Sequence, residues 1–148
     1  MRNLTRGLFI PIAVCFLIPT ALLNAHHGVA AYDYKATVVT KATVAHFDWT
    51  NPHCKIFFDH ADGAHNLEHW VVEMHPPAEM VEHGWTRQTL SPGDVVTLSF
   101  RPAKDGSTSG LLIGVVLPNG IELHQNAFLL PPGETLSIEQ WERRKRRS

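Results

Sequence analysis

Two adjacent histidines, His26 and His27, lie where a short apolar segment of the sequence ends. If a protease cuts after Ala25, His26 becomes the first residue of the mature chain. Its α-amine and its ring Nδ1 can then chelate one metal ion, and a second imidazole would complete a T-shaped set of nitrogen ligands that suits Cu(II). If Ala25 stays in place, an amine, two backbone amides and the His27 imidazole can bind copper or nickel. Either cut creates a ligand set for a copper-type cation.

A specific metal site also needs ligands from the folded body of the protein. His53, His69 and Glu73 fall at outward-facing positions of two predicted strands, because side chains alternate between the two faces of a strand. His46 lies at the end of an earlier predicted strand. Neutral imidazole is the form that binds metal, and it is available near pH 7. The alternative is a set of scattered surface histidines. The predicted metal ligands are His26, His27, His53, His69 and Glu73.

The segment Trp49-Thr50-Asn51-Pro52-His53 forms a predicted loop between two strands. In a small barrel such a loop flanks the binding face, so Trp49 and Asn51 are candidates for contact with a small ligand or a sugar. Trp49 can instead close one end of the barrel. We favour closure for Trp49, because large aromatic side chains dominate the energetics of protein cores.

The motifs of common enzymes are missing from the sequence. Cys54 follows His53, but neighbours on a strand point to opposite faces, so the two cannot form a nucleophile and base pair. We expect Cys54 to be a small core residue. The sequence contains no metalloprotease helix motif, phosphate-binding glycine loop, haem-attachment motif or serine elbow. It therefore predicts a binding protein rather than an enzyme, and copper-dependent redox chemistry is the remaining enzymatic alternative.

The first residues have the pattern of a secretory signal peptide. Arg2 and Arg6 precede an apolar run over residues 8–18, and Ala25 occupies the cut position. The apolar run is too short to cross a bilayer, which needs about 20 residues. We therefore expect a periplasmic or secreted protein with no transmembrane segment in the mature chain. Removal of the signal leaves Cys54 as the sole cysteine, so no internal disulfide can form.

Alternating apolar positions, separated by turn signals, predict a series of strands. The expected strands cover residues 36–47, 53–59, 69–74, 95–101, 111–117 and 121–124. A helix of about two turns is expected over 78–83, between the third and fourth strands, with Gly84 as its C-cap. This order matches the OB-fold. We therefore predict a mainly β protein with a small five- to six-stranded antiparallel barrel, OB-like; a general antiparallel barrel or sandwich is the alternative.

The expected organisation is a signal peptide over 1–25, a barrel domain over 26–128, and a linker with a basic C-terminal tail over 129–148. Ser137 and Gln140 have the spacing of a capping box, which predicts a short final helix. The basic end of that helix could make weak contact with anionic lipid headgroups. The alternative is a frayed, solvated tail.

The charge distribution excludes one class of partner. Between His26 and Trp141 the sequence contains 6 basic and 13 acidic residues, a net charge of −7 with neutral histidines. An acidic surface repels nucleic-acid phosphates and attracts cations. We therefore expect a monomeric protein that binds a cation or a small ligand and does not bind nucleic acid.

Several short elements, in this order, resemble an uncharacterised family of small exported bacterial proteins, a domain of unknown function. The resemblance covers nearly all of residues 26–125. The Trp-x-Asn-Pro-His element is its most specific piece, and the chain departs from the family pattern at Lys41-Ala42, where the family has glycine. No activity follows from the resemblance. Its elements are His26-His27, Asp33, Trp49-Thr50-Asn51-Pro52-His53, Trp70-Val71-Val72-Glu73, Gly84-Trp85 and Pro92-Gly93-Asp94-Val95-Val96-Thr97.

Overall fold

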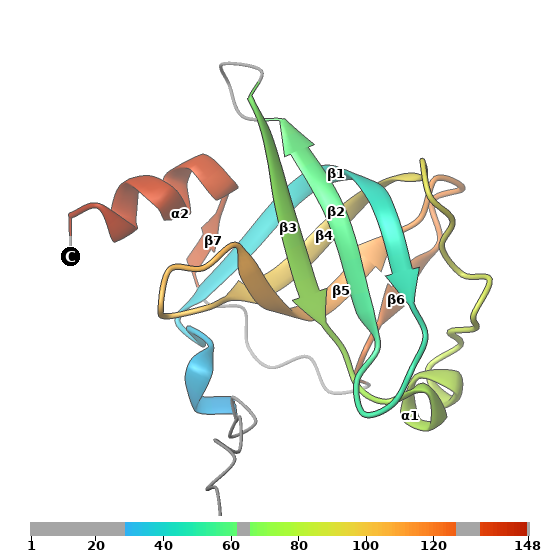
Figure 1. The fold of residues 1–148 in the computed structure, drawn as a ribbon. Coiled ribbons are helices and arrows are strands. Elements are labelled where there is room, and N and C mark those ends of the chain that lie inside the picture. The colour runs from blue at the N-terminus through green and yellow to red at the C-terminus, as the bar shows by residue number, and fades with distance from the viewer. Residues whose placement is uncertain (1–28, 62–65, 127–133, 148) are drawn as a thin grey trace, which may run out of the picture.

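The computed structural model describes residues 29–61, 66–126 and 134–147, which are mainly β (Figure 1). The strands are β1 (Ala36–Asp48), β2 (Lys55–Ala61), β3 (Leu67–Glu73), β4 (Val95–Pro102), β5 (Ser109–Val116), β6 (Glu122–His124) and β7 (Glu134–Leu136). The helices are the 3-10 helix η1 (Val29–Ala31), α1 (Pro77–Glu82) and α2 (Ile138–Lys145). The prediction of a mainly β protein with two short α-helices is confirmed. The predicted signal peptide and the histidine pair lie outside the described residues.

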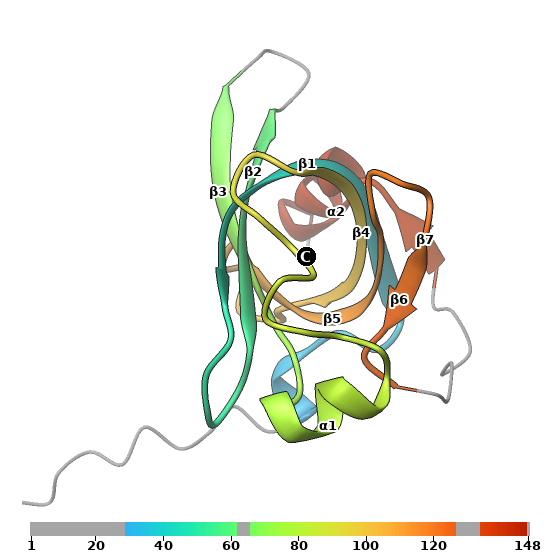
Figure 2. The same cartoon turned by 90° about the vertical axis from the view of Figure 1, so that its right-hand side faces the viewer.

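Five of the strands form a ring, which Figure 2 shows nearly end on. β1 pairs with β2, β2 with β3, β3 with β5, β5 with β4, and β4 with β1. β6 pairs with β5, and β7 pairs with β1. The prediction of a purely antiparallel arrangement is wrong, because β3–β5 and β1–β7 are parallel. α1 and β4 separate β3 from β5 in sequence, so the direction of that pairing follows from closure of the ring and not from a local turn.

The interior of the ring is filled by the alternate positions that the sequence predicted to be apolar. Ile56 and Phe58 of β2 and Trp70 and Val72 of β3 are at most 2% exposed. The rings of Phe58, Trp70 and Phe100 contact one another with centroids 5.6 to 6.4 Å apart. Since these residues point inward, the residues between them on β2 and β3 must point to the outer face.

Helix α1 lies beside one end of the ring, below its opening as drawn in Figure 2. Pro76, in an extended conformation, precedes it, and Gly84 follows it with a φ of 83°. This positive φ favours glycine, as the predicted C-cap requires. Met80 is fully buried, so the helix contributes to the same core as the strands.

The C-terminal residues 134–147 belong to the folded body. The capping box of α2 is present, since Gln140 N donates to Ser137 Oγ at 3.2 Å and Ser137 N donates to Gln140 Oε1 at 2.7 Å. Ile138 and Trp141 are buried in the core cluster, and β7 adds to the edge of β1. The predicted final helix is therefore present and packs on the core, while its basic end, with Arg143, Arg144, Arg146 and Arg147, is exposed to solvent. The Pro-Pro-Gly linker at 131–133 lies outside the described residues.

No helix within the described ranges is long and apolar enough to cross a bilayer.

Candidate ligand-binding site

The outer face of β2 and β3 carries most of the predicted metal ligands from the body of the protein. In the register of this pair, Lys55 lies opposite Glu73, Phe57 opposite Val71, and Asp59 opposite His69. These residues alternate with the buried ones, as the sequence predicted. The face therefore presents the apolar pair Phe57–Val71 between the polar pairs Lys55–Glu73 and Asp59–His69.

The structure brings together only part of the predicted ligand set. His53 Nδ1 lies 3.9 Å from Glu73 Oε2. His69 instead contacts Asp59, with 2.6 Å between Nδ1 and Oδ1, and it lies four residues along β3 from Glu73, a distance of about 13 Å. His46 lies opposite Phe57, and their ring centroids are 6.0 Å apart.

Metal-binding side chains do not cluster in the described part of the chain: no three of them lie close enough together to hold an ion. His26 and His27 lie outside that part. Within the described residues, His53 and Glu73 are therefore a pair of candidate ligands without a third.

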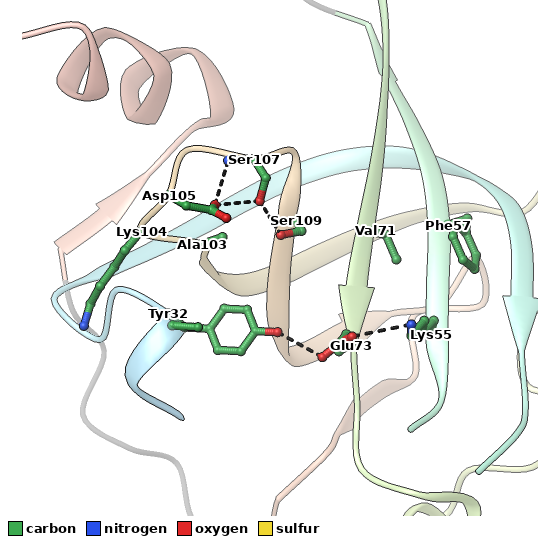
Figure 3. A pocket seen from close by; sticks show the side chains of 11 residues that line it. Tyr32, Lys55, Phe57, Val71, Glu73, Ala103, Lys104, Asp105, Ser107 and Ser109 are labelled. Atoms are coloured by element: carbon green, nitrogen blue, oxygen red, sulfur yellow. Dashed lines mark hydrogen bonds and ion pairs between the residues drawn. The ribbon is translucent and has the colours of Figure 1, made fainter. Parts of the chain in front are cut away.

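A pocket of ≈ 370 Å³ lies against the end of this face that contains Glu73 (Figure 3). Four segments that are far apart in the sequence form it, namely β2, β3, the β4–β5 loop with the start of β5, and the residues that follow η1. Its lining residues are Ala31, Tyr32, Lys55, Phe57, Val71, Glu73, Ala103, Lys104, Asp105, Ser107 and Ser109.

Glu73 is the polar centre of one side of the pocket (Figure 3). The Tyr32 hydroxyl donates to Glu73 Oε2 at 3.0 Å, and Lys55 Nζ lies 3.5 Å from Glu73 Oε1. Burial, together with the negative charge of Glu73, raises the pKa of the Tyr32 hydroxyl well above its ordinary value. Tyr32 therefore stays protonated at neutral pH and acts as a hydrogen-bond donor.

The amino-terminal segment is fixed to the pocket wall by backbone hydrogen bonds. Asp33 N donates to Pro102 O, and Lys104 N donates to Ala31 O, both at 2.9 Å. Lys104 Nζ also donates to Ala30 O at 2.8 Å. Ala30 and Ala31 are therefore held against the Lys104 side of the pocket.

The β4–β5 loop forms the opposite wall. Asp105 Oδ1 accepts hydrogen bonds from Ser107 N at 2.9 Å and from Ser107 Oγ at 2.7 Å, and Ser107 Oγ lies 2.7 Å from Ser109 Oγ. Gly106 turns the loop with a φ of 78°, and its carbonyl oxygen accepts from Lys145 Nζ of α2 at 2.6 Å. Helix α2 thus supports this wall from outside.

The predicted ligand-face residues Trp49 and Asn51 do not line this pocket. Trp49 is 9% exposed, belongs to the core cluster and meets Phe47 edge to face at 5.6 Å, which fits the favoured role in closing an end of the ring. Asn51 is exposed, and its peptide bond to Pro52 is cis.

Cys54 is fully buried, and burial raises the pKa of its thiol to about 11. The prediction of a core cysteine is confirmed. Its neighbour His53 also precedes β2, and the His53 side chain is 41% exposed and lies near Glu73.

Sequence reasoning missed Tyr32, Phe57 and Lys55 as lining residues. Phe57 gave a usable signal, because it is a large aromatic residue at an outward-facing position of a strand whose core positions are already apolar. Tyr32 gave none, since nothing local connects residue 32 with residue 73. The β4–β5 loop lay between the expected strands 95–101 and 111–117 and had no predicted role.

Comparison with known proteins gives a family match without an activity. The model of a family of unknown function (DUF6152) matches residues 16–113. No curated protein and no solved structure matches the chain.

Proposed function

The chain belongs to the family of unknown function DUF6152, a description that carries no activity, and we propose that it is an exported, non-catalytic binding protein. Its ligand occupies the pocket between β2, β3, Tyr32 and the β4–β5 loop. The pocket itself is the observation that carries this proposal, because a concave site with an apolar floor and a few convergent polar groups is the usual form of a small-molecule site. Export rests on the signal-like sequence of residues 1–25.

We further propose that the ring is an OB-like barrel. The strand pairings and the position of α1 between β3 and β4 support this assignment. OB-folds bind ligands on the face of strands 2 and 3, between the loops that connect strands 1 to 2 and 4 to 5. The pocket occupies the equivalent face and includes the equivalent β4–β5 loop.

The chemistry of the lining residues favours binding over catalysis. Tyr32 has a raised pKa and is committed to Glu73, and Glu73 also faces Lys55. A general acid or base works best with a pKa near the operating pH, so Tyr32 is unsuited to proton transfer. Cys54, the one nucleophilic thiol in the described residues, is buried away from the pocket.

A fragment screen by NMR tests the proposed site. Isotope-labelled protein beginning at His26 is titrated with a mixed set of small neutral, cationic and anionic organic compounds. We expect amide shifts to gather in β2, β3 and residues 103–109. Phe57→Ala should weaken the binding of the hits. Leu67→Ala is the control and should not weaken it, because Leu67 is a 59% exposed residue of β3 on the same outer face of the sheet but outside the pocket. Hits that gather elsewhere, or that bind Phe57→Ala normally, would contradict the proposal.

A copper-type cation is the second candidate ligand. The favouring observation is that His53 and Glu73 approach to 3.9 Å at the pocket end of the face, beside the segment that follows the histidine pair. Three residues separate His27 from Ala30, whose carbonyl is bound by Lys104, so His27 Cα lies within about 11 Å of Ala30 Cα. An amino-terminal chelate with His53 or Glu73 as a further ligand is thus within reach.

Calorimetric titration with Cu(II) tests this candidate on the mature protein, after mass spectrometry has established that the chain begins at His26. His26→Ala and the double variant His53→Ala/Glu73→Gln should each weaken binding by at least about tenfold. His69→Ala is the matched control, because His69 faces Asp59 and not Glu73, and its affinity should be unchanged. An affinity no higher than that of a free His-His-Gly peptide would exclude a built site.

A further inference from the structure

We propose that the ligand of the pocket is an uncharged saccharide. This inference rests on the proposed function and adds the chemical class of the ligand. It is carried by three properties of the lining residues, namely their balance of charge, their mixture of hydrogen-bonding groups and the exposed aromatic ring on the floor.

The charged residues that line the pocket balance in number. Two are cationic, Lys55 and Lys104, and two are anionic, Glu73 and Asp105. Lys55 and Glu73 form an ion pair, Lys104 Nζ donates to a backbone carbonyl, and Asp105 accepts two hydrogen bonds from Ser107. The lining thus has no net formal charge to offset the hydration that a charged ligand would lose on binding. The pocket favours a ligand with no net charge.

The polar groups of the pocket both donate and accept hydrogen bonds. The Lys55 ammonium can only donate and the Glu73 carboxylate can only accept, whereas the hydroxyls of Ser107 and Ser109 can do both. A ligand hydroxyl also donates and accepts, so a ring of hydroxyls can match all four groups. A ligand with acceptors alone would match only some of them.

The floor of the pocket adds an apolar surface. Phe57 is 38% exposed beside Val71, and the Tyr32 ring lines the neighbouring wall. A sugar ring has C–H groups on its flat faces and hydroxyls at its rim, so it can cover an aromatic ring while its rim reaches the polar groups. The volume of ≈ 370 Å³ lies at the small end of the usual range for ligand pockets and suits a mono- or disaccharide.

Glucose and two of its charged derivatives, glucuronate and glucosamine, share the glucopyranose ring and provide the test. Each is titrated into isotope-labelled protein near pH 7, and amide shifts in β2, β3 and residues 103–109 report binding. We expect glucose to bind at least about threefold more tightly than either charged analogue. Phe57→Ala should weaken glucose binding by about tenfold, and Leu67→Ala should change it less than about twofold.

A charge variant tests the same argument in the opposite direction. Lys55→Met leaves the Glu73 carboxylate without its ammonium partner, so glucosamine should become the preferred hexose. Lys41→Met, an exposed lysine of β1 that does not line the pocket, is the matched control and should keep the preference for glucose.

The possible outcomes separate this inference from the proposed function. Tighter binding of a charged hexose, or glucose binding that Phe57→Ala leaves unchanged, overturns the saccharide inference. If no hexose shifts the pocket amides while other fragments do, the inference fails and the binding pocket stands. If neither sugars nor fragments bind there, both proposals fail.

Discussion

At the scale of single residues, Arg101 shows how the sequence hides a structural role. It is 3% exposed, and its Nη1 donates to Thr37 Oγ1 at 2.9 Å and to the carbonyl oxygens of Tyr34 and Ala36 at 3.2 Å. Its guanidinium also lies over the Tyr34 ring at 5.5 Å. One cation thereby holds the start of β1 against β4.

Replacing Arg101 should therefore destabilise the protein. We expect Arg101→Met to lower the free energy of unfolding by about 1–3 kcal/mol, because buried carbonyl oxygens lose their donor. Arg101→Lys should restore only part of it, since an ammonium cannot reproduce the planar fork. Urea unfolding measures both variants. If Arg101→Met and Arg101→Lys lowered the free energy of unfolding equally, a role for the guanidinium geometry would be contradicted.

Cys54 gives a second prediction at this scale. Because burial raises its thiol pKa to about 11, the thiol stays protonated at neutral pH and is shielded from reagents. Native protein near pH 8 should react with a chromogenic thiol reagent only as fast as it unfolds. Guanidinium-unfolded protein, the control, should react within the mixing time. Rapid reaction of the native protein would contradict this expectation and show that the buried Cys54 thiol becomes accessible without unfolding.

The sequence predicts whether each side chain of β2 and β3 points into the ring or outward. It does not predict which residue of the other strand lies beside it. The period of two placed Ile56 and Trp70 inward and His69 and Glu73 outward, as observed. Which outward residues meet depends on the register between the strands, which the sequence pattern does not contain. This is why His53 and Glu73 approach each other while His69 lies with Asp59.

At the scale of elements, α2 is a docked helix and Trp141 is its main anchor. This side chain is 6% exposed within the core cluster. We expect Trp141→Ala to reduce the free energy of unfolding by about 2–4 kcal/mol, since a large buried side chain leaves a cavity. Arg143→Ala, at an exposed position of the same helix, should change it by less than about 0.5 kcal/mol. Urea unfolding compares them, and equal losses would contradict the anchoring role.

The contact of α2 with the sheet also predicts a pH effect. Glu139 accepts from Ser137 Oγ at 2.6 Å, and its other oxygen lies 3.1 Å from Nε2 of the buried His60 ring, whose Nδ1 lies 2.9 Å from Thr40 Oγ1. The Ser137 hydroxyl, followed by the backbone N–H of Glu139 and the His60 ring, lowers the pKa of the Glu139 carboxyl.

Because this pKa is lower in the folded than in the unfolded state, ionised Glu139 adds stability above the unfolded value of about 4.3 and loses it as the pH falls through the folded pKa. Glu139→Gln should remove that part of the acid sensitivity. The side chain is 37% exposed, so solvent screening limits the effect to less than about 1 kcal/mol. Urea unfolding near pH 7 and near pH 3 measures it. If the free energy of unfolding changed between pH 7 and pH 3 by the same amount in Glu139→Gln and in the unaltered protein, the role of Glu139 would be contradicted.

Elements with strong local signals were predictable, and short ones were not. The capping box of Ser137 and Gln140 and the C-cap at Gly84 correspond to α2 and α1. β7 has only three residues after a proline pair, and its pairing with β1 is parallel and distant in sequence. No local pattern indicates such a strand, and for this reason the sequence assigned it to a tail.

At the scale of the whole molecule, the ring closes where β5 meets β3 and β4, and Gly110 lies at this closure. It is opposite Val72 on one side and Pro102 on the other. A Cβ there would collide with the Phe100 ring and lie 2.8 Å from Arg101 O.

Gly110→Ala should therefore destabilise the protein by about 1–3 kcal/mol and expose the β3–β5 amides to hydrogen exchange. Val116→Ala, at an exposed position of the same strand, is the control and should leave exchange unchanged. Unaltered exchange in Gly110→Ala would show that the closure tolerates the added methyl group.

The order of the elements from β1 to β6 could be predicted, whereas the closure and the pocket could not. Each turn signal, such as Pro92-Gly93 and Asn119-Gly120, connects elements that are neighbours in sequence. The β3–β5 pairing and the contact of Tyr32 with Glu73 join segments that are far apart. The candidate pocket arises from such distant contacts, so its assembly becomes visible only in three dimensions.

The hydrogen bond from Lys145 to Gly106 has a practical consequence for binding assays. A protein immobilised on a sensor chip through its C-terminus would pull on the helix that supports one pocket wall, and amino-terminal attachment would block the histidine pair. The exposed Asn119-Gly120 hairpin turn lines no part of the pocket and is the better attachment point, through a cysteine introduced there.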